Sequence, residues 1–125
     1  MSLTREAIVE RLQSLLGAEQ VVTDDQVLRE RSIDNFRKLQ NIFGVYTMPV
    51  PAAVAHVRST GDVAKVLAFA QEHGVNVVAR TGGTATEGGL ETPVENSVVV
   101  DGGQMNAILD IDAYNMQATV QCGVP

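Results

Sequence analysis

The chain has 125 residues, a net charge of -6 and an apolar content of 45%. That length suffices for one domain with a modest core, and the acidic balance argues against non-specific nucleic-acid binding, which needs a surface rich in Lys and Arg. A single cysteine, Cys122, leaves no internal disulfide. A secreted disulfide scaffold is therefore excluded and the cytoplasm is expected. The charged N-terminus is neither a signal peptide nor a membrane span.

Residues 1–48 carry most of the helical signals and are predicted to form an N-terminal helical segment. Thr4 is a typical N-cap residue, apolar side chains follow it at helical spacing, and Gly17 predicts the end of that helix. Thr23-Asp24-Asp25-Gln26 has the pattern of a capping box, with Thr23 at the N-cap, and predicts a short helix to about Arg31. Residues 32–44 give no clear assignment.

Two prolines, Pro49 and Pro51, break any helix and mark the start of the second part, residues 49–125. Residues 54–57 are predicted to form a strand. Ser59-Thr60-Gly61-Asp62 is a second capping-box pattern, and it opens a helix that closes at His73-Gly74. Since the β-branched run 75–79 follows, residues 54–79 are predicted to form a β-α-β unit with a parallel strand pair and a right-handed crossover.

Short strands are predicted again near the C-terminus. Residues 98–100 form one, and residues 108–111 and 118–120 form two more, separated by the turn-like segment 112–115. The last two are predicted to pair as a hairpin. The expected fold class is therefore α+β: N-terminal helices, then a β-α-β unit followed by antiparallel strands.

A glycine-rich loop, residues 80–89, directly follows the second strand of the β-α-β unit. Adjacent glycines tolerate positive φ and bring no Cβ, and consecutive N–H groups in such a loop can converge on an anion. Thr84 and Thr86 add hydroxyl donors, and Arg80 adds positive charge, so the loop suits a diphosphate. From spacing alone, a surface loop whose glycines only make turns is an equal alternative. The loop is neither a P-loop nor a Rossmann fingerprint, because it lacks a Lys-Ser/Thr pair and no helix follows it.

The sequence resembles the FAD-binding domain (PCMH-type) of the vanillyl-alcohol oxidase / p-cresol methylhydroxylase superfamily. Its similarity is greatest to the branch of D-lactate dehydrogenases and the glycolate oxidase flavin subunit. That branch has an R-G-G-G-T-S-x-x-G-type loop; Thr81 and Ala85 depart from it, whereas the other fixed positions match it. Ser32-Ile33-Asp34 resembles a family segment that lies before the first strand, and the strands and the hairpin occur in the family order.

This resemblance implies an FAD cofactor held by the loop. The implied cofactor-binding residues are Arg80, Thr81, Gly82, Gly83, Thr84, Ala85, Gly88 and Gly89. Some relatives attach FAD covalently through a His in this loop, at the position that Thr84 occupies here; threonine cannot form that link, so non-covalent FAD is expected. The family domain continues past residue 125, which suggests that this chain is a truncated N-terminal fragment. The catalytic residues would lie in the missing part, so no residue of this chain is expected to be catalytic.

The full-length parent is then expected to be an FAD-dependent oxidoreductase that acts on a small 2-hydroxy acid such as D-lactate or glycolate. An alkylglycerone-phosphate synthase-like enzyme or a cell-wall-precursor reductase-like enzyme is the alternative, since both use this type of domain. A third alternative is an inert fragment that binds no flavin. The chain alone is expected to be inactive. Phe36, Phe43 and Tyr46 are expected either to cover the sheet or to form a surface that docks another domain; where the rest of the protein is absent and they are exposed, homo-oligomers are expected.

Three further residues, two histidines and the cysteine, are of types that can have a catalytic role. His56 has no apparent carboxylate partner, which favours a structural or surface role. His73 suits the last turn of its helix, and Cys122 is predicted to be a core thiol. No metal site is expected, because His, Cys and acidic residues show no ligand spacing.

Overall fold

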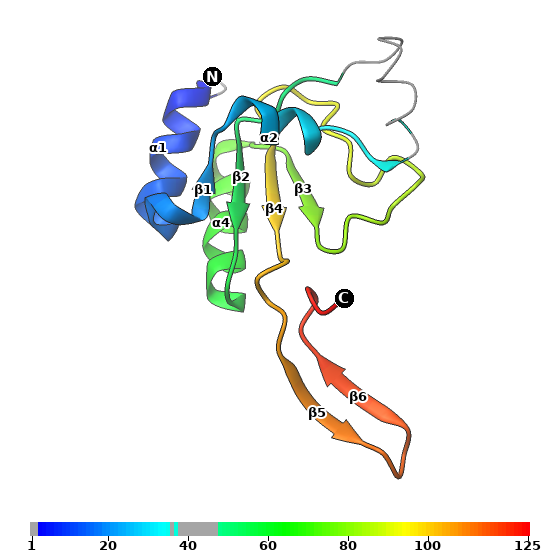
Figure 1. Ribbon diagram of the computed structural model, residues 1–125. Coiled ribbons are helices and arrows are strands. Elements are labelled where there is room, and N and C mark those ends of the chain that lie inside the picture. The colour runs from blue at the N-terminus through cyan, green and yellow to red at the C-terminus, as the bar shows by residue number, and fades with distance from the viewer. Residues whose placement is uncertain (1–2, 36, 38–47) are drawn as a thin grey trace.

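The computed structural model describes residues 3–35, 37 and 48–125. Within these residues, four strands form one sheet in the order β1-β2-β4-β3, with bounds β1 (Val21–Val22), β2 (Ala53–His56), β4 (Val98–Asp101) and β3 (Val77–Arg80). The three strands β2, β4 and β3 are parallel, and β1 joins antiparallel to β2. Figure 1 shows this sheet with helices beside it and a hairpin that extends away from it.

The first helix is α1 (Arg5–Leu16), and both of its predicted ends are confirmed. The Thr4 Oγ1 accepts a hydrogen bond from the N–H of Ala7 at 3.3 Å. Gly17 ends the helix with a φ of 101°, a conformation that side-chain-bearing residues rarely adopt. A short 3-10 turn, η1 (Ala18–Gln20), then leads into β1.

The long helix α4 (Thr60–His73) also begins and ends where the sequence predicts. Ser59 is its N-cap and accepts the N–H of Asp62 at 3.1 Å. The carboxylate of Asp62 accepts the N–H of Arg58 at 3.0 Å, so the two side chains satisfy donors on both sides of the helix start. Gly74 closes the helix in the left-handed conformation, with a φ of 64°.

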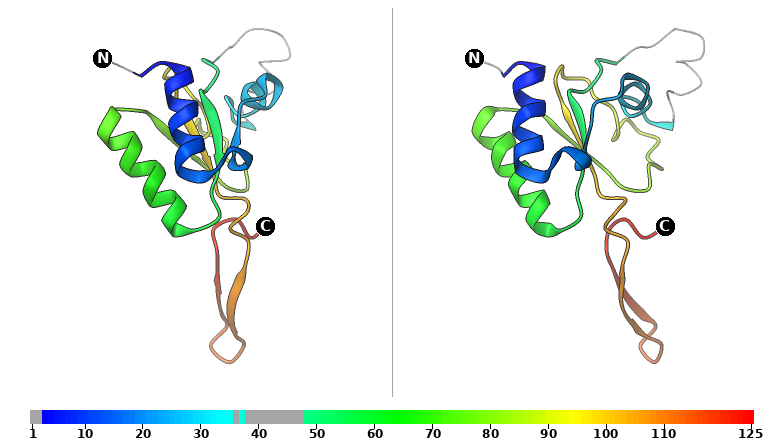
Figure 2. Two further views of the ribbon diagram at one scale, coloured as in Figure 1. Left: turned by 90° about the vertical axis from the view of Figure 1, so that its left-hand side faces the viewer. Right: turned by 60° about the vertical axis from the view of Figure 1, so that its left-hand side comes forward.

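Both long helices pack on one face of the sheet (Figure 2). The larger core lies there, where Ile8 and Leu12 of α1 meet Val66 and Phe69 of α4 over the alanines and valines of β2 and β4. The opposite face carries α2 (Asp25–Glu30), whose Leu28 packs against Val54 and Val99. Residues from both predicted parts of the chain, 1–48 and 49–125, therefore share one core.

Residues 21–31 differ from the sequence analysis in two ways: one prediction was wrong and one strand was not predicted. The N-cap of α2 is Asp24, whose Oδ1 accepts the N–H of Val27 at 3.0 Å; the prediction of Thr23 was wrong. Because Asp caps a helix at least as well as Thr, the helix begins one residue later. The sequence also did not indicate β1, since two valines are too short a run to predict a strand.

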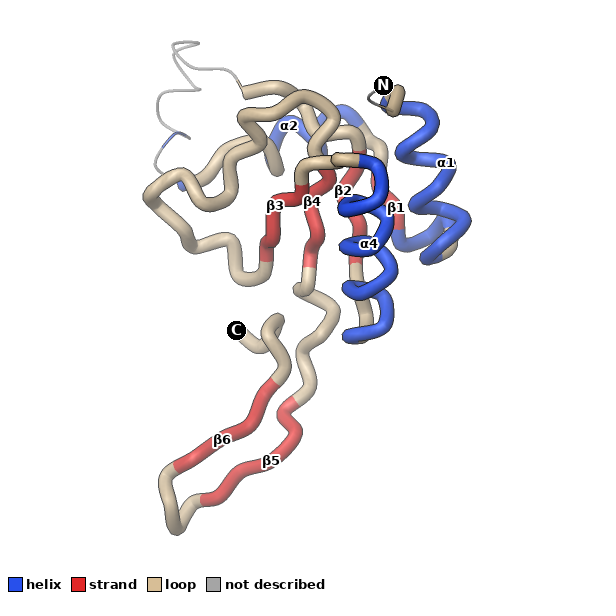
Figure 3. The backbone as a smooth tube through the Cα atoms, turned by 180° about the vertical axis from the view of Figure 1, so that it is seen from behind, coloured by secondary structure: helices blue, strands red, loops and turns tan. Residues whose placement is uncertain are grey.

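The β-α-β prediction is right in its elements and wrong in its pairing. β2, α4 and β3 follow each other as expected, but β2 and β3 are not neighbours, because β4 lies between them and pairs with both. Figure 3 shows β4 flanked by the other two strands behind α4. Residue patterns predict strands and their burial, whereas strand order depends on tertiary packing.

The predicted hairpin is confirmed as β5 (Ile108–Asp112) and β6 (Gln117–Val120). It projects from the body of the molecule in Figures 1 and 2. An irregularity between Ile108 and Asp110 shifts the register, so that Ile108 faces Val120 while Ile111 faces Ala118. Side chains in register share a face, so these four form one apolar face of the hairpin, and the opposite face carries acidic and amide groups.

Phe36, Phe43 and Tyr46, the aromatic residues expected to form an associating surface, lie outside the described residues. Among the described residues, no helix has the length and apolar character needed to cross a membrane.

Candidate functional site

The glycine-rich loop follows β3 at the carboxyl edge of the parallel strands. Thr81, Gly82, Thr84 and Thr86 are exposed there. Gly83 has a φ of 68°, which favours glycine. Ligands of open parallel sheets bind at this edge, so the loop stands where a ligand is expected.

Asn35 holds the loop by two carbonyl groups. Its Nδ2 donates to the carbonyl oxygen of Gly83 at 2.8 Å, and its backbone N–H donates to that of Ala85 at 3.3 Å. The N-terminal part of the chain therefore fixes two alternate peptide units of a loop that lies almost 50 residues away in sequence.

This clamp determines where the loop N–H groups point. In a trans peptide the C=O and N–H point in opposite directions, and the described residues contain no cis peptide. Because the carbonyls of Gly83 and Ala85 face Asn35, the N–H groups of Thr84 and Thr86 face away from it. No hydrogen bond within the described part of the chain engages the N–H groups of residues 82–86. Residues 82, 84 and 86 are exposed and residues 83 and 85 are partly exposed, and these N–H groups form a set of donors of the kind that binds anions.

The neighbouring segment fixes the far end of the loop. The carboxylate of Asp34, which is 1% exposed, accepts the N–H of Gly88. Next to it, the carbonyl of Ser32 accepts the N–H of Thr92 at 3.1 Å. Ser32-Ile33-Asp34, which the sequence indicated only as similar to a family segment before the first strand, thus lies against the loop. The N–H of Gly88 is occupied by Asp34 and is not one of the exposed donors.

Arg80 lies on the buried side of the loop, with 7% of its surface exposed. A Cβ added at Gly83 would lie 2.8 Å from Arg80 Nη2, so the guanidinium packs directly against that glycine. The carbonyl of Arg80 accepts the N–H of Gly102 at 2.8 Å. Arg80 is thus a buried side chain that contacts the loop at Gly83.

Three polar residues stand in one row at the carboxyl ends of the parallel strands. His56, Asp101 and Arg80 are in register across β2, β4 and β3, so their side chains share the face that α2 covers. Asp101 Oδ1 lies 3.9 Å from His56 Nδ1. His56 therefore has a carboxylate neighbour, and the expectation of none was wrong, because the two residues are 45 positions apart in sequence.

The C-terminal segment passes close to the loop. A Cβ added at Gly102 would lie 3.0 Å from Cys122 Sγ and 3.4 Å from Thr81 Cγ2. One added at Gly123 would lie 2.3 Å from the carbonyl oxygen of Gly102. Gly123 has no room for a Cβ, because the close atoms belong to the backbone, whereas the close atoms at Gly102 belong to side chains. Cys122 is exposed, so its prediction as a core thiol was wrong; it follows β6, and the projecting hairpin buries few of its residues.

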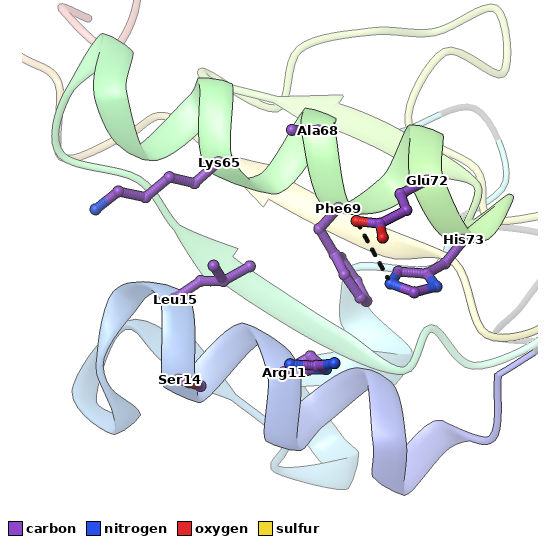
Figure 4. A pocket seen from close by; sticks show the side chains of 8 residues that line it. All are labelled: Arg11, Ser14, Leu15, Lys65, Ala68, Phe69, Glu72 and His73. Atoms are coloured by element: carbon purple, nitrogen blue, oxygen red, sulfur yellow. Dashed lines mark ion pairs between the residues drawn. The ribbon is translucent and has the colours of Figure 1, made fainter.

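A separate groove of about 320 Å³ lies between α1 and α4 (Figure 4). It is lined by Arg11, Lys65, Glu72 and His73 together with apolar side chains. The His73 ring packs on Phe69 with centroids 5.1 Å apart, in the last turn of α4 as expected. The groove belongs to the helical face of the sheet and includes no residue of the glycine-rich loop.

Sequence reasoning missed Asn35, Asp101 and the glycines at 102 and 123 as parts of this region. Asn35 follows the Ser32-Ile33-Asp34 segment directly, and Asp101 ends a predicted strand, so position in the chain offered a weak signal. The strand order and the course of the N-terminal segment bring these residues to the loop. Local sequence patterns predict neither of them.

The sequence of this chain matches a known protein family and several known proteins. The family described as "FAD binding domain" matches residues 51–125. A protein of Escherichia coli described as the uncharacterized FAD-linked oxidoreductase YgcU is 58% identical over all 125 residues, which are 26% of its own length. Glycolate oxidase subunit GlcD of Bacillus subtilis is 41% identical over 75 residues, 60% of this chain and 16% of that protein.

A solved structure of an alkyldihydroxyacetonephosphate synthase superposes with a TM-score of 0.82 at 20% identity, covering 98% of this chain and 25% of that one. The match confirms the expected α+β fold. The chain spans about a quarter of the length of the curated relatives that match it throughout.

Proposed function

Because the chain belongs to the FAD binding domain family, we propose that the exposed N–H groups of residues 82–86 bind the diphosphate of FAD. The observation that carries this proposal is the Asn35 clamp, which turns the N–H groups of Thr84 and Thr86 outward. A loop of outward N–H groups binds an anion without needing net positive charge, which agrees with the acidic chain.

The residues at this site fit a diphosphate. A Cβ added at Gly82 would have 3.9 Å to the nearest atom, so the glycine leaves open space above the backbone. Thr81 and Thr84 are exposed and have hydroxyls beside it, while Ala85 supplies a backbone group only. Gly88 and Gly89 would act through the shape of the loop, since Asp34 already takes the Gly88 N–H. Arg80 would act from the buried side.

For the full-length protein, we propose an FAD-dependent oxidoreductase that oxidises a small 2-hydroxy acid. The 41% identity to a protein named glycolate oxidase subunit supports this substrate class over the alternatives, because the synthase likeness rests on fold alone. When bound, FAD supplies the two-electron acceptor, and this chain's part is to hold the diphosphate and orient the cofactor. Residues 1–125 alone are expected to give no turnover.

Flavin titration tests the binding proposal. Purified chain is titrated into FAD at constant flavin concentration while quenching of the flavin fluorescence is measured, and the unfolding temperature of the chain is measured in a separate series of rising FAD concentration. We expect the fluorescence signal to saturate and the unfolding temperature to keep rising with the logarithm of FAD concentration, because a ligand that binds only the folded state stabilises it. Riboflavin, which lacks the diphosphate, is the control and should bind much more weakly. Equal binding of FAD and riboflavin would contradict diphosphate recognition by the loop.

Non-covalent attachment is tested separately. Thr84 stands where a covalent histidine would be, so acid precipitation of the flavin-loaded full-length protein should leave all yellow colour in the supernatant. Colour that stays with the precipitated polypeptide would refute this part of the proposal.

A further inference from the structure

The buried guanidinium of Arg80 has an unusual position for a charged group. Its Nη1 is buried and has no hydrogen-bond partner among the described residues, and the whole residue is 93% inaccessible. Burying a charge without full pairing costs free energy. Such a group persists when something else in the working protein compensates it.

The nearby carboxylate does not provide full compensation. Asp101 stands beside Arg80 in register, but its Oδ2 also lies 3.9 Å from Arg31 Nη2, and its Oδ1 accepts the N–H of Gly103 at 2.9 Å. Two guanidinium groups therefore share one carboxylate. The Nε of Arg31 is likewise buried without a partner in the described part of the chain. The cluster carries an excess of one positive charge.

The pKa of Arg80 agrees with an excess of positive charge in this cluster. Loss of hydration on burial lowers its pKa, repulsion from Arg31 lowers it further, and attraction to Asp101 opposes these effects only in part. The guanidinium stays charged at neutral pH, because arginine does not lose its proton in proteins.

We propose that Arg80 is a positioning charge on the buried side of the loop, and that an anion bound by the exposed loop N–H groups completes its compensation. This inference rests on the proposed diphosphate site and adds a mechanism to it. Arg80 packs against Gly83, and the N–H groups of Thr84 and Thr86 point away from Asn35, so the charge of Arg80 adds to these donors at short range and needs no direct contact with the anion. The empty chain is accordingly less stable than its packing allows, and the anion relieves that cost.

Two variants with opposite expected signs test this inference. Arg80→Met removes the charge and keeps much of the volume, so affinity for pyrophosphate and FAD should fall on the order of tenfold, while the ligand-free chain should unfold at an equal or higher temperature. Asp101→Asn raises the positive excess by one, so the ligand-free chain should lose stability while affinity for pyrophosphate rises. Damage to the loop would weaken binding in both variants. Calorimetry with inorganic pyrophosphate and thermal unfolding supply the two readouts.

Arg80→Lys separates charge from shape. It keeps a cation at the buried position and should recover part of the affinity lost in Arg80→Met. Equal affinities of these two variants, or an Asp101→Asn chain that binds more weakly than the unaltered chain, would overturn the inference. If Arg80→Met does not fold, the Asp101→Asn result decides alone.

The outcomes also separate this inference from the proposed function. Binding of neither FAD nor pyrophosphate by the unaltered chain would refute both. Pyrophosphate binding without FAD binding would refute the flavin assignment and leave the charge mechanism to be judged by the variants. Normal binding in Arg80→Met, with FAD bound by the unaltered chain, would refute the charge mechanism only.

Discussion

Asn35 has no obvious role in the sequence, but in the structure it fixes the conformation of the glycine-rich loop. Replacing it with Ala removes the 2.8 Å bond to the carbonyl of Gly83 and frees that peptide unit to rotate. One such bond is worth about 1 kcal/mol, so Asn35→Ala should weaken FAD binding about fivefold. Flavin fluorescence titration measures the effect. Gln71→Ala, an exposed amide on α4, is the control and should bind as before; unchanged affinity in Asn35→Ala would contradict the clamp.

Gly82 and Gly83 form a matched pair for a test of backbone conformation. Gly83 has a positive φ and no room for a Cβ beside Arg80, whereas Gly82 has neither constraint. Gly83→Ala should lower the free energy of unfolding by about 1–2 kcal/mol, and Gly82→Ala should leave it within about 0.5 kcal/mol. Urea denaturation of ligand-free chains measures both. Equal losses in the two variants would show that the Gly83 conformation carries no special requirement.

At the scale of single residues, prediction succeeded where a local rule decides the outcome. Thr4, Ser59 and Gly74 cap their helices as expected, because capping depends on residues three or four positions away. The prediction that Thr23 caps α2 was wrong because its neighbour Asp24 is an equally good cap. His56 was misjudged because its carboxylate neighbour, Asp101, comes from another strand.

The helix α4 depends on a carboxylate whose protonation should show in stability. The N–H of Arg58 donates to Asp62 and holds the pKa of that carboxyl below its ordinary value, with the Gln20 amide and Lys65 adding to the effect. The folded state therefore prefers the ionised form. Its contribution is complete above about pH 4, the unfolded pKa, and is lost as pH falls through the lower folded pKa.

Asp62→Asn should accordingly reduce stability by about 0.5–1 kcal/mol at pH 7, a partly exposed hydrogen bond being worth no more. The difference from the unaltered chain should shrink as pH falls below about 4. Chemical denaturation from pH 3 to pH 7 measures this. Asp25→Asn, which removes an exposed ion pair with Arg29, is the control and should show little pH-dependent difference. A difference that stays constant to pH 3 would contradict the assigned role.

At the scale of elements, the sequence predicted which segments are helices and strands better than it predicted their neighbours. The hairpin was found because turn residues separate two β-type runs. The position of β4 between β2 and β3 was missed, since each of the three parallel strands has the same apolar character and any order would bury it. The two-residue strand β1 had no pattern long enough to detect.

For the molecule as a whole, the apolar face of the projecting hairpin is an exposed hydrophobic feature of the described residues. Ile108 and Ile111 of this face are each at least 60% exposed. Contiguous apolar surface of this kind drives association, so the 13.3 kDa chain should self-associate as its concentration rises. Sedimentation velocity over a concentration series measures this.

Ile111→Thr keeps a β-branched strand residue and removes apolar surface, so it should shift the chain toward the monomer. Thr119→Ser lies on the opposite face of the hairpin and serves as the control. A chain that stays monomeric at all concentrations, or an Ile111→Thr variant that associates as strongly as the unaltered chain, would contradict association through this face.

The contacts of Asp34 and Asn35 with the loop have a kinetic consequence. They join residues 54 and 48 positions apart, and contacts of such long range are late to form, because closing a long stretch of chain precedes any gain from them. The strands and α4 can assemble while the loop is still unshaped. Ability to hold a ligand should therefore appear after most secondary structure, and the rate of its appearance should follow the docking of residues 32–35.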